Sequence, residues 1–84
     1  MPLYYFHLRD GDDVLLDPEG CEFPDLASVR ARALLSARSL MSADILEGRL
    51  QLDLRIDVED GARRLIYRLP FADAVETIPE RSRG

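Results

Sequence analysis

The chain holds one histidine, His7, and one cysteine, Cys21, so these two residues come first when nucleophilic chemistry is considered. A cysteine nucleophile needs contact with a histidine and a third group that orients the ring. Cys21 lies between Glu19 and Glu22, and negative charge beside a thiol disfavours the reactive thiolate. No glycine-rich phosphate loop and no Ser–His–Asp pattern is present. We therefore predict no catalytic residues and a chain that is not an enzyme.

The acidic residues offer a second kind of chemistry, the binding of a cation. Seven acids and no base occupy one stretch: Asp10, Asp12, Asp13, Asp17, Glu19, Glu22 and Asp25. An EF-hand loop that starts at Asp10 would need an oxygen ligand, a glycine and a glutamate where the chain has Val14, Leu15 and Cys21. One cysteine and one histidine do not make a four-ligand zinc site. The sequence thus predicts no metal and no cofactor, with a weak divalent-cation module as a minor alternative.

The charge balance limits the partners that the protein can have. The 84 residues include 16 acids and 11 bases, all arginine, for a net charge of −5. The acidic stretch carries −7, which leaves +2 on the remaining residues. This balance excludes a dedicated duplex-binding module. Arg30, Arg32 and Arg38 point in three different directions around a helix and form no basic stripe. A small regulatory nucleic-acid binder stays as the second hypothesis, and we expect nucleic acid to be an unlikely partner.

Size and hydropathy set further expectations. A domain this small buries only about 60–65% of its surface, so its stability is marginal and self-association, such as a homodimer, is a plausible source of further stability. No apolar run approaches the roughly 20 residues of a membrane span, so no membrane association is expected. The opening residues lack the pattern of a secretory signal. A cytoplasmic protein is therefore expected.

The first part of the chain predicts a hairpin. Leu3–Arg9 is a short, aromatic-rich strand, followed by a turn at Asp10–Asp13 and a return strand at Val14–Leu16. A two-residue loop would place Asp10 opposite Asp13, an unfavourable like-charge pair. A three-residue loop places Leu8 opposite Leu16 and brings His7 opposite Asp17. We favour the three-residue loop.

A long helix follows a second turn. Asp17–Gly20 fits a type I turn, and residues 21–23 form a brief extended segment. Asp25 is placed as the N-cap of a helix over residues 26–47, which Gly48 ends. One apolar stripe faces the core: Leu26, Val29, Ala33, Leu34, Ala37, Leu40 and Met41. The small residues Ala33 and Ala37 let the helix lie close to a sheet.

The last part predicts a second hairpin. Apolar and polar residues alternate strictly over residues 50–59, and Asp60–Gly61 indicates a two-residue loop before a partner strand over residues 64–69. On the buried face this register pairs Ile56 with Leu65, Leu54 with Tyr67 and Leu52 with Leu69. On the polar face it pairs Asp57 with Arg64 and Asp53 with Arg68, each pair contributing roughly 0.2–1 kcal/mol.

Together these elements predict an α+β protein in the order ββαββ, with one antiparallel sheet covered on one face by a single long helix. Residues 1–78 form a single compact domain, and residues 79–84 form a polar, frayed C-terminal tail. Pro70 ends the last strand, and Phe71–Ile78 stays open between a helical turn and a short extended cover.

The second face of the sheet has no helix to cover it, which makes it the candidate binding surface. Residues expected there are Tyr5, His7, Arg9, Arg55, Ile66 and Arg68. Such a mixture is typical of interfaces, although a merely solvated face fits equally well. Asp12, Asp13 and Asp17 in the acidic hairpin would supply an electrostatic handle. We therefore expect a small protein-interaction module, with a protein partner or a second copy of the chain.

Several motifs resemble one family. They are the opening Met1–Gly11, the Asp17–Gly20 turn with Glu22 and Pro24–Asp25 after it, the Ala/Arg-rich helix, and the late segment Leu69–Val75. In this combination the chain resembles a family of small bacterial proteins, frequent in rhizobia and their alphaproteobacterial relatives, known as a domain of unknown function. The resemblance covers residues 1–76. It implies a compact single-domain α+β protein and carries no activity, cofactor or catalytic residue with it.

Overall fold

A computed structural model of the chain describes residues 1–76 and 78. Its elements, in chain order, are β1 (Leu3–Asp10), β2 (Asp13–Leu15), β3 (Cys21–Glu22), α1 (Leu26–Leu46), β4 (Leu54–Asp60), β5 (Leu65–Pro70) and the 3₁₀ turn η1 (Phe71–Asp73). The polar tail predicted for residues 79–84 lies outside the described residues. Within residues 1–76 and 78, no helix combines the length and the apolar character that a membrane span needs.

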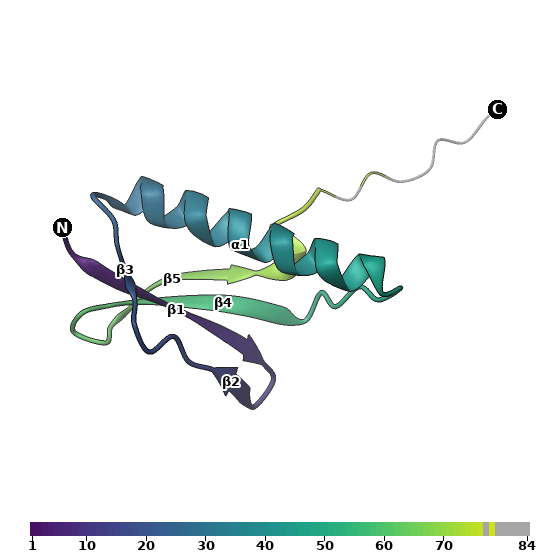
Figure 1. Ribbon diagram of the computed structural model, residues 1–84, viewed down its shortest axis with the longest axis horizontal. Helices are drawn as coiled ribbons and strands as arrows, with labels where there is room; N and C mark the ends of the chain where they lie inside the picture. Colours follow the sequence, from purple (N-terminus) through teal and green to yellow (C-terminus); the bar gives the residue numbers. More distant parts are fainter. Residues whose placement is uncertain (77, 79–84) are drawn as a thin grey trace.

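One antiparallel sheet and one helix make up the fold, as the sequence predicted. The strand order is β2-β1-β4-β5, and the short β3 also pairs with β1. Figure 1 shows α1 lying over one side of this sheet only, so no helix of the described residues covers the opposite side. The α+β class is therefore confirmed, with β3 as one strand more than the expected order.

The helix follows its sequence signals closely. The carboxylate of Asp25 accepts a hydrogen bond from the N–H of Ser28 at 2.8 Å, which confirms the predicted N-cap. Gly48 takes φ +82°, the left-handed conformation that ends a helix. Val29, Ala33, Ala37 and Met41, four residues apart, form the buried row. Leu26 and Leu40, predicted in the core stripe, are instead exposed at the margins of that row.

The first hairpin uses the register that we did not favour. Leu8 pairs with Leu15 rather than Leu16, and Asp10 pairs with Asp13 across a two-residue loop. Gly11 adopts φ +60°, the value that primed hairpin turns require, and such turns match the twist of the strands. Asp10 and Asp13 are both exposed, so water screens their repulsion. Turn geometry therefore outweighs the like-charge pair.

The second hairpin also differs from its predicted register, by four residues. Ile56 pairs with Leu69, not Leu65, and Val58 pairs with Tyr67. Asp60 and Gly61 do not form the predicted two-residue loop, because the Asp60 carboxylate accepts the N–H groups of Ala62 and Arg64 at the start of a longer loop. A register shift between Val58 and Glu59 adds one more residue on the β5 side. A slip of four is even, so Ile56 and Val58 keep their predicted buried face.

Strand β4 starts at Leu54, whereas the alternation predicted a strand from residue 50. Leu50 and Leu52 are exposed. Asp10, the last residue of β1, pairs with Leu54, so β1 turns away just where residues 50–53 would need a neighbour. On the other side Arg55 pairs with Pro70, after which the chain leaves the sheet. Alternation alone does not make a strand when neither neighbouring strand extends that far.

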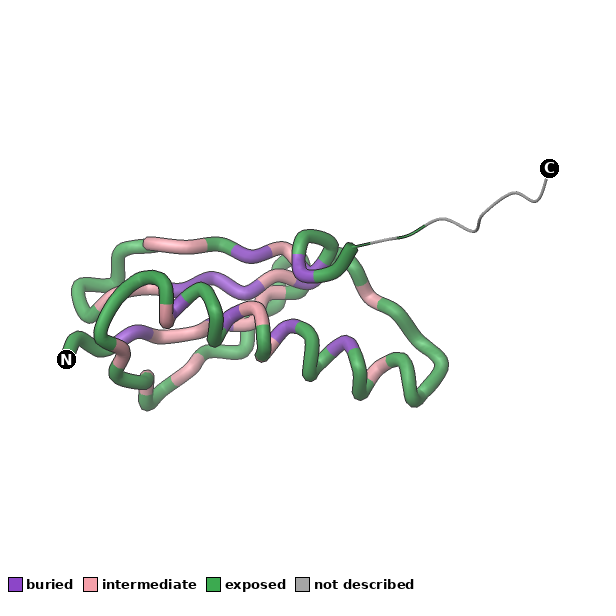
Figure 2. The backbone as a smooth tube through the Cα atoms, turned by 90° about the horizontal axis from the view of Figure 1, so that it is seen from above, coloured by how far each residue is buried: buried purple, intermediate pink, exposed green. Residues whose placement is uncertain are grey.

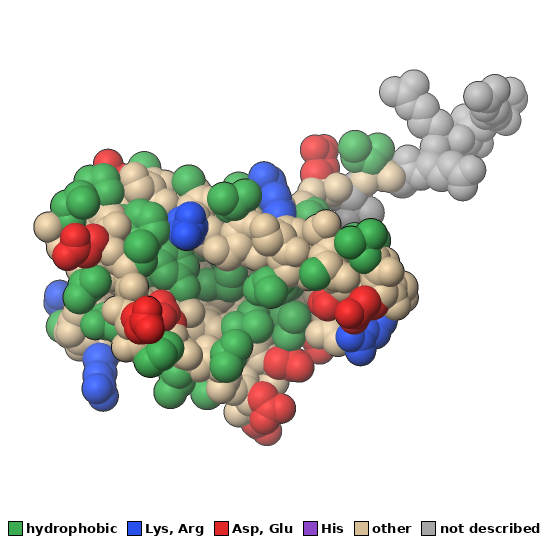
Figure 3. Space-filling model, viewed as in Figure 1, with side chains coloured by type: hydrophobic (Ala, Val, Ile, Leu, Met, Phe, Trp, Pro, Cys, Tyr) green, Lys and Arg blue, Asp and Glu red, His purple; other side chains and the backbone are tan. Residues whose placement is uncertain are grey.

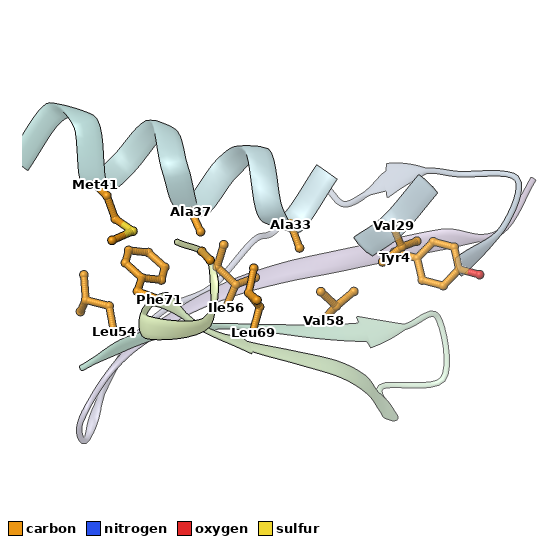
Figure 4. Close-up of a cluster of buried hydrophobic side chains, with 11 residues drawn as sticks. Tyr4, Val29, Ala33, Ala37, Met41, Leu54, Ile56, Val58, Leu69 and Phe71 are labelled. Carbon is orange, nitrogen blue, oxygen red and sulfur yellow. The ribbon is translucent and has the colours of Figure 1, made fainter. Parts of the chain in front are cut away.

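The core lies between α1 and the middle of the sheet. Figure 4 shows Ala33, Ala37 and Met41 facing Ile56, Leu69 and Phe71. Seen from above, buried residues gather along the central strands and along one side of the helix (Figure 2). The segment after Pro70, left open by the sequence, forms the turn η1. The fully buried side chain of Phe71 anchors this turn, and Arg38 donates to the carbonyl of Ala74 at 2.8 Å.

Candidate functional site

The side of the sheet without a helix carries mostly polar side chains, and we call it the open sheet face. Its members come from β1, β4 and β5: Tyr5, His7, Arg9, Arg55, Asp57, Glu59, Leu65 and Arg68. Cross-strand pairing sets the rows, because directly paired residues share a face. Arg9 lies opposite Arg55, and His7 lies opposite Asp57, which in turn lies opposite Arg68.

Asp57 lies at the centre of this face; the sequence predicted its pairing with Arg64 but did not predict it as a site residue. Its side chain is only 4% exposed, although it is a carboxylate on the helix-free side. Arg68 donates to it through two bonds, Nε to Oδ1 at 2.8 Å and Nη2 to Oδ2 at 3.2 Å. Arg9 Nε lies 2.9 Å from Oδ2, and Arg55 Nε lies 3.4 Å from Oδ1. Three arginines therefore cover and bury one carboxylate.

This arrangement corrects the predicted ion pairs. Arg68 pairs with Asp57, not with Asp53, and Arg64 pairs with Asp60 at 3.1 Å, not with Asp57. Burial raises the pKa of Asp57, but the hydrogen bond from Arg68 and the charges of Arg68, Arg55 and Arg9 outweigh it, so the pKa is lowered. Asp57 is thus held as an anion within the sheet.

His7 is buried and fully hydrogen-bonded. Its Nδ1 accepts a bond from the backbone N–H of Asp17 at 3.1 Å, and its Nε2 lies 3.2 Å from Oε1 of Glu59. Because Nδ1 accepts, the neutral ring carries its proton on Nε2 and donates it to Glu59. His7 thus contacts Asp17 although the three-residue loop that predicted this pairing does not form, and the ring connects the acidic stretch to β4.

A depression of about 490 Å³ lies beside His7 on the same face. Its walls come from Tyr5, from the segment 16–18 and from the loop that follows β4. The rings of Tyr5 and His7 stack with an interplanar angle of 11°. Gly20, at φ +72°, lies so close to Tyr5 that a Cβ there would be 2.8 Å from Cε2 of the ring. Only glycine suits this position, which keeps Tyr5 in place.

Asp17 has a structural task within the acidic stretch. Its carboxylate accepts the backbone N–H groups of Phe6 at 3.2 Å, Glu19 at 3.2 Å and Gly20 at 3.1 Å. Asp12 and Asp13, by contrast, are exposed at the β1–β2 turn. Of the three carboxylates predicted as an electrostatic contact, Asp12 and Asp13 therefore face solvent, whereas Asp17 holds the turn against β1.

The structure brings together most of the residues predicted for the second face and separates one of them. Tyr5, His7, Arg9, Arg55 and Arg68 share the open sheet face. Ile66 is half-buried and packs against the hydrophobic core, next to the register shift in β4. Asp57 and Glu59 were missed as site residues. Their positions in the alternation placed them on this face, but no sequence signal marked Asp57 as buried.

A second uncovered area lies on the helix side, where α1 packs over β4, β5 and η1 and leaves β1 beside it. Figure 3 shows a hollow between the helix and the strands below it, with hydrophobic side chains along its walls. A cavity of about 290 Å³ there is lined by Leu8, Leu40, Ala43 and Leu54 with polar residues at its margin. The exposure of Leu40 follows from this incomplete cover.

The residues considered for metal binding and thiol chemistry also have defined positions in the structure. Among residues 1–76 and 78, no three His, Cys, Asp or Glu side chains come together as a metal site requires. Cys21 is exposed in β3 as a free thiol.

Fold and face together define a small α+β protein whose antiparallel sheet is packed against a helix on one side and presents a charged surface without a helix on the other. The chain belongs to the family described as Domain of unknown function (DUF6894), whose model matches residues 3–72. No curated protein and no solved structure matches the chain. The expected resemblance is confirmed as membership of a family of unknown function, and its frequent occurrence in rhizobia and their relatives stays a prediction.

Acid should unfold the protein through carboxylates that the fold holds ionised. Burial raises the pKa of Asp17, but the N–H groups of Gly20, Phe6 and Glu19 outweigh it, so the pKa is lowered, as it is for Asp57. A lowered folded-state pKa stabilises the fold above the unfolded pKa, and this stability is lost as pH falls through the folded value. We expect the urea midpoint to change little between pH 7 and 5 and to fall steeply below about pH 4.

Two asparagine variants test the origin of this acid sensitivity. Asp17→Asn keeps an acceptor oxygen and removes the titrating group, so its midpoint should fall less between pH 5 and pH 3 than that of the wild type. Asp12→Asn removes an exposed carboxylate from the neighbouring turn and should keep the wild-type profile. Identical profiles for Asp17→Asn and wild type would contradict the role given to Asp17.

Proposed function

We propose that the protein is a non-enzymatic interaction module of the cytoplasm that binds an acidic segment of a partner protein through the open sheet face. The observation that carries the proposal is the excess of arginine around Asp57 on a face that no helix covers. Arginine and tyrosine are enriched in protein interfaces, and both occur here. The exposed thiol of Cys21 suits a reducing compartment.

Charge supports an acidic partner. Three guanidinium groups surround one carboxylate, so the centre of the face keeps an excess of positive charge. Charge complementarity of this kind guides the approach of a partner and fixes its orientation. The depression beside Tyr5 and His7 could accommodate a side chain of the same partner.

The acidic hairpin takes a complementary part in this proposal. Asp12 and Asp13 are exposed at the β1–β2 turn, next in sequence to Arg9 and Asp10. They repel acidic partners that approach from that end and attract basic residues that flank the bound segment. Asp17 acts by positioning the turn, because its carboxylate is occupied by backbone N–H groups.

A pair of matched leucine variants tests the proposal. Leu65 pairs with Glu59 on the open sheet face and is 49% exposed, and Leu35 on the outer side of α1 is 59% exposed. Leu65→Asp places a carboxylate within the proposed interface, whereas Leu35→Asp makes the same change elsewhere. We expect Leu65→Asp to lose its partners in quantitative affinity capture from native lysate, and Leu35→Asp to retain them.

Light scattering of the same three proteins shows whether the partner is a second copy of the chain. A dimer that Leu65→Asp breaks and Leu35→Asp keeps would assign the open sheet face to self-association. Equal capture and equal mass for both variants and the wild type would show that the open sheet face is not the interface, and the proposal would be wrong.

A further inference from the structure

We propose that Arg9 and Arg55 form a binding site for a carboxylate group of a partner's aspartate or glutamate side chain. The inference deepens the proposed function and rests on it. It names the two guanidinium groups that hold the partner and the chemical group that they hold.

Asp57 does not satisfy the hydrogen-bonding capacity of Arg9 and Arg55. Arg68 alone makes two hydrogen bonds to it, one to each carboxylate oxygen. The Nε atoms of Arg9 and Arg55 lie 2.9 Å and 3.4 Å from Asp57, but their N–H groups point at no acceptor within the described chain. Both Nε atoms are buried, and a buried donor without an acceptor is unfavourable. The Nε–H groups of Arg9 and Arg55 therefore lie beside the Asp57 carboxylate without donating a hydrogen bond to it.

Arg9 and Arg55 also repel each other. They are direct cross-strand partners in the register of β1 and β4, and like charges in such positions destabilise a sheet. Asp57 offsets only part of this repulsion, because it is shared among three arginines. A second carboxylate placed between Arg9 and Arg55 would balance the charge and accept hydrogen bonds from both.

The two side chains are accessible to such a group. The side chain of Arg9 is 35% exposed and that of Arg55 is 32% exposed, so part of each side chain reaches solvent although both Nε atoms are buried. Guanidinium forks bind carboxylates with two parallel hydrogen bonds. Two half-buried arginines lose less side-chain entropy on binding than freely exposed ones.

The surroundings favour a carboxylate on a protein over the phosphates of a nucleic acid. Glu59 and Asp57 lie on the same face, and Asp10, Asp12 and Asp13 follow directly at the end of β1. A chain of phosphates would extend over these acids, and each contact would be repulsive. A single carboxylate between Arg9 and Arg55 avoids them.

Nuclear magnetic resonance on the full-length protein tests the inference, because the Nε–H signals of arginine report directly on these groups. The probe is an octapeptide of glutamate, compared with an octapeptide of glutamine and with an eight-residue oligouridylate. We expect the glutamate peptide to shift the Nε–H signals of Arg9 and Arg55 in a saturable way. Arg55→Gln should weaken this binding at least about tenfold, with Arg9→Gln as the second variant if Arg55→Gln alters the fold.

Arg32→Gln is the control, because it removes one exposed arginine of α1 and changes the net charge equally. The inference is wrong if Arg32→Gln weakens binding of the glutamate peptide as much as Arg55→Gln does. It is also wrong if the glutamate peptide shifts neither the Arg9 nor the Arg55 Nε–H signal. Shifts caused by oligouridylate and not by the glutamate peptide overturn it as well. If Leu65→Asp loses its partners but the glutamate peptide shifts neither arginine Nε–H signal, the proposed function stands and only the carboxylate site is wrong.

Discussion

Replacing Asp57 by alanine should lower the free energy of unfolding by about 3 kcal/mol. The carboxylate is buried beneath three arginines, so its removal leaves three cations that repel one another and lack a counter-charge. The three arginine side chains are 32–48% exposed, so water screens part of their repulsion. The expected cost is therefore at the lower end of the range for breaking a buried ion pair. A domain of this size has a total stability of only about 4–13 kcal/mol.

Urea denaturation followed by circular dichroism measures this cost, and Asp53 supplies the matched control. Asp57→Asn keeps the shape of the side chain and should still be strongly destabilised. Asp53→Asn makes the same change at an exposed position before β4 and should stay within about 0.5 kcal/mol of the wild type. Equal costs at the two positions would mean that Arg68 pairs with Asp53, as the simple hairpin register predicts, and that the arginine cluster does not form.

Phe71→Ala should cost about 3–5 kcal/mol, the range for removing a buried aromatic ring. The ring is fully buried between α1 and the sheet, although it follows the last strand in a short 3₁₀ turn. Its loss leaves a cavity next to Met41 and Leu54 (Figure 4). It also frees the turn whose Ala74 carbonyl accepts a bond from Arg38.

Two further variants define what the ring contributes. Phe71→Leu keeps an apolar side chain in the cavity and should cost clearly less than Phe71→Ala. Val75→Ala, at a position 37% exposed just beyond the turn, should cost less than about 0.5 kcal/mol. A Phe71→Ala protein within about 1 kcal/mol of the wild type would show that the turn does not pack beneath the helix.

The register of the second hairpin explains why part of the site escaped prediction. Arg64 and Arg68 are four residues apart, as are Asp53 and Asp57, so a slip of four residues still leaves an arginine opposite Asp57. Pairwise charge matching therefore could not separate the two registers. The contact of Arg9 from β1 with Asp57 belongs only to the assembled sheet, and it joins residues nearly fifty positions apart.

The first hairpin shows the same limit at shorter range. Repulsion between Asp10 and Asp13 argued for a longer loop, but the backbone preference of Gly11 and the screening of exposed charges decided otherwise. The helix, in contrast, was predicted within one residue at its C-terminal end. Its N-cap at Asp25 and its stop at Gly48 act through neighbours less than five residues apart, and the four-residue spacing of its apolar side chains indicated the buried row.

By itself, the sequence determined the helix, the faces of most strand residues and the presence of a single long helix on one side of the sheet. These features follow from local hydrogen bonds and from hydrophobic period, which neighbouring residues settle among themselves. Only the tertiary structure decided which arginines meet Asp57, how deeply that carboxylate is buried, and that Phe71 turns back into the core. These depend on where β1, β4 and β5 end relative to one another, because the burial of a side chain is a property of all the strands around it.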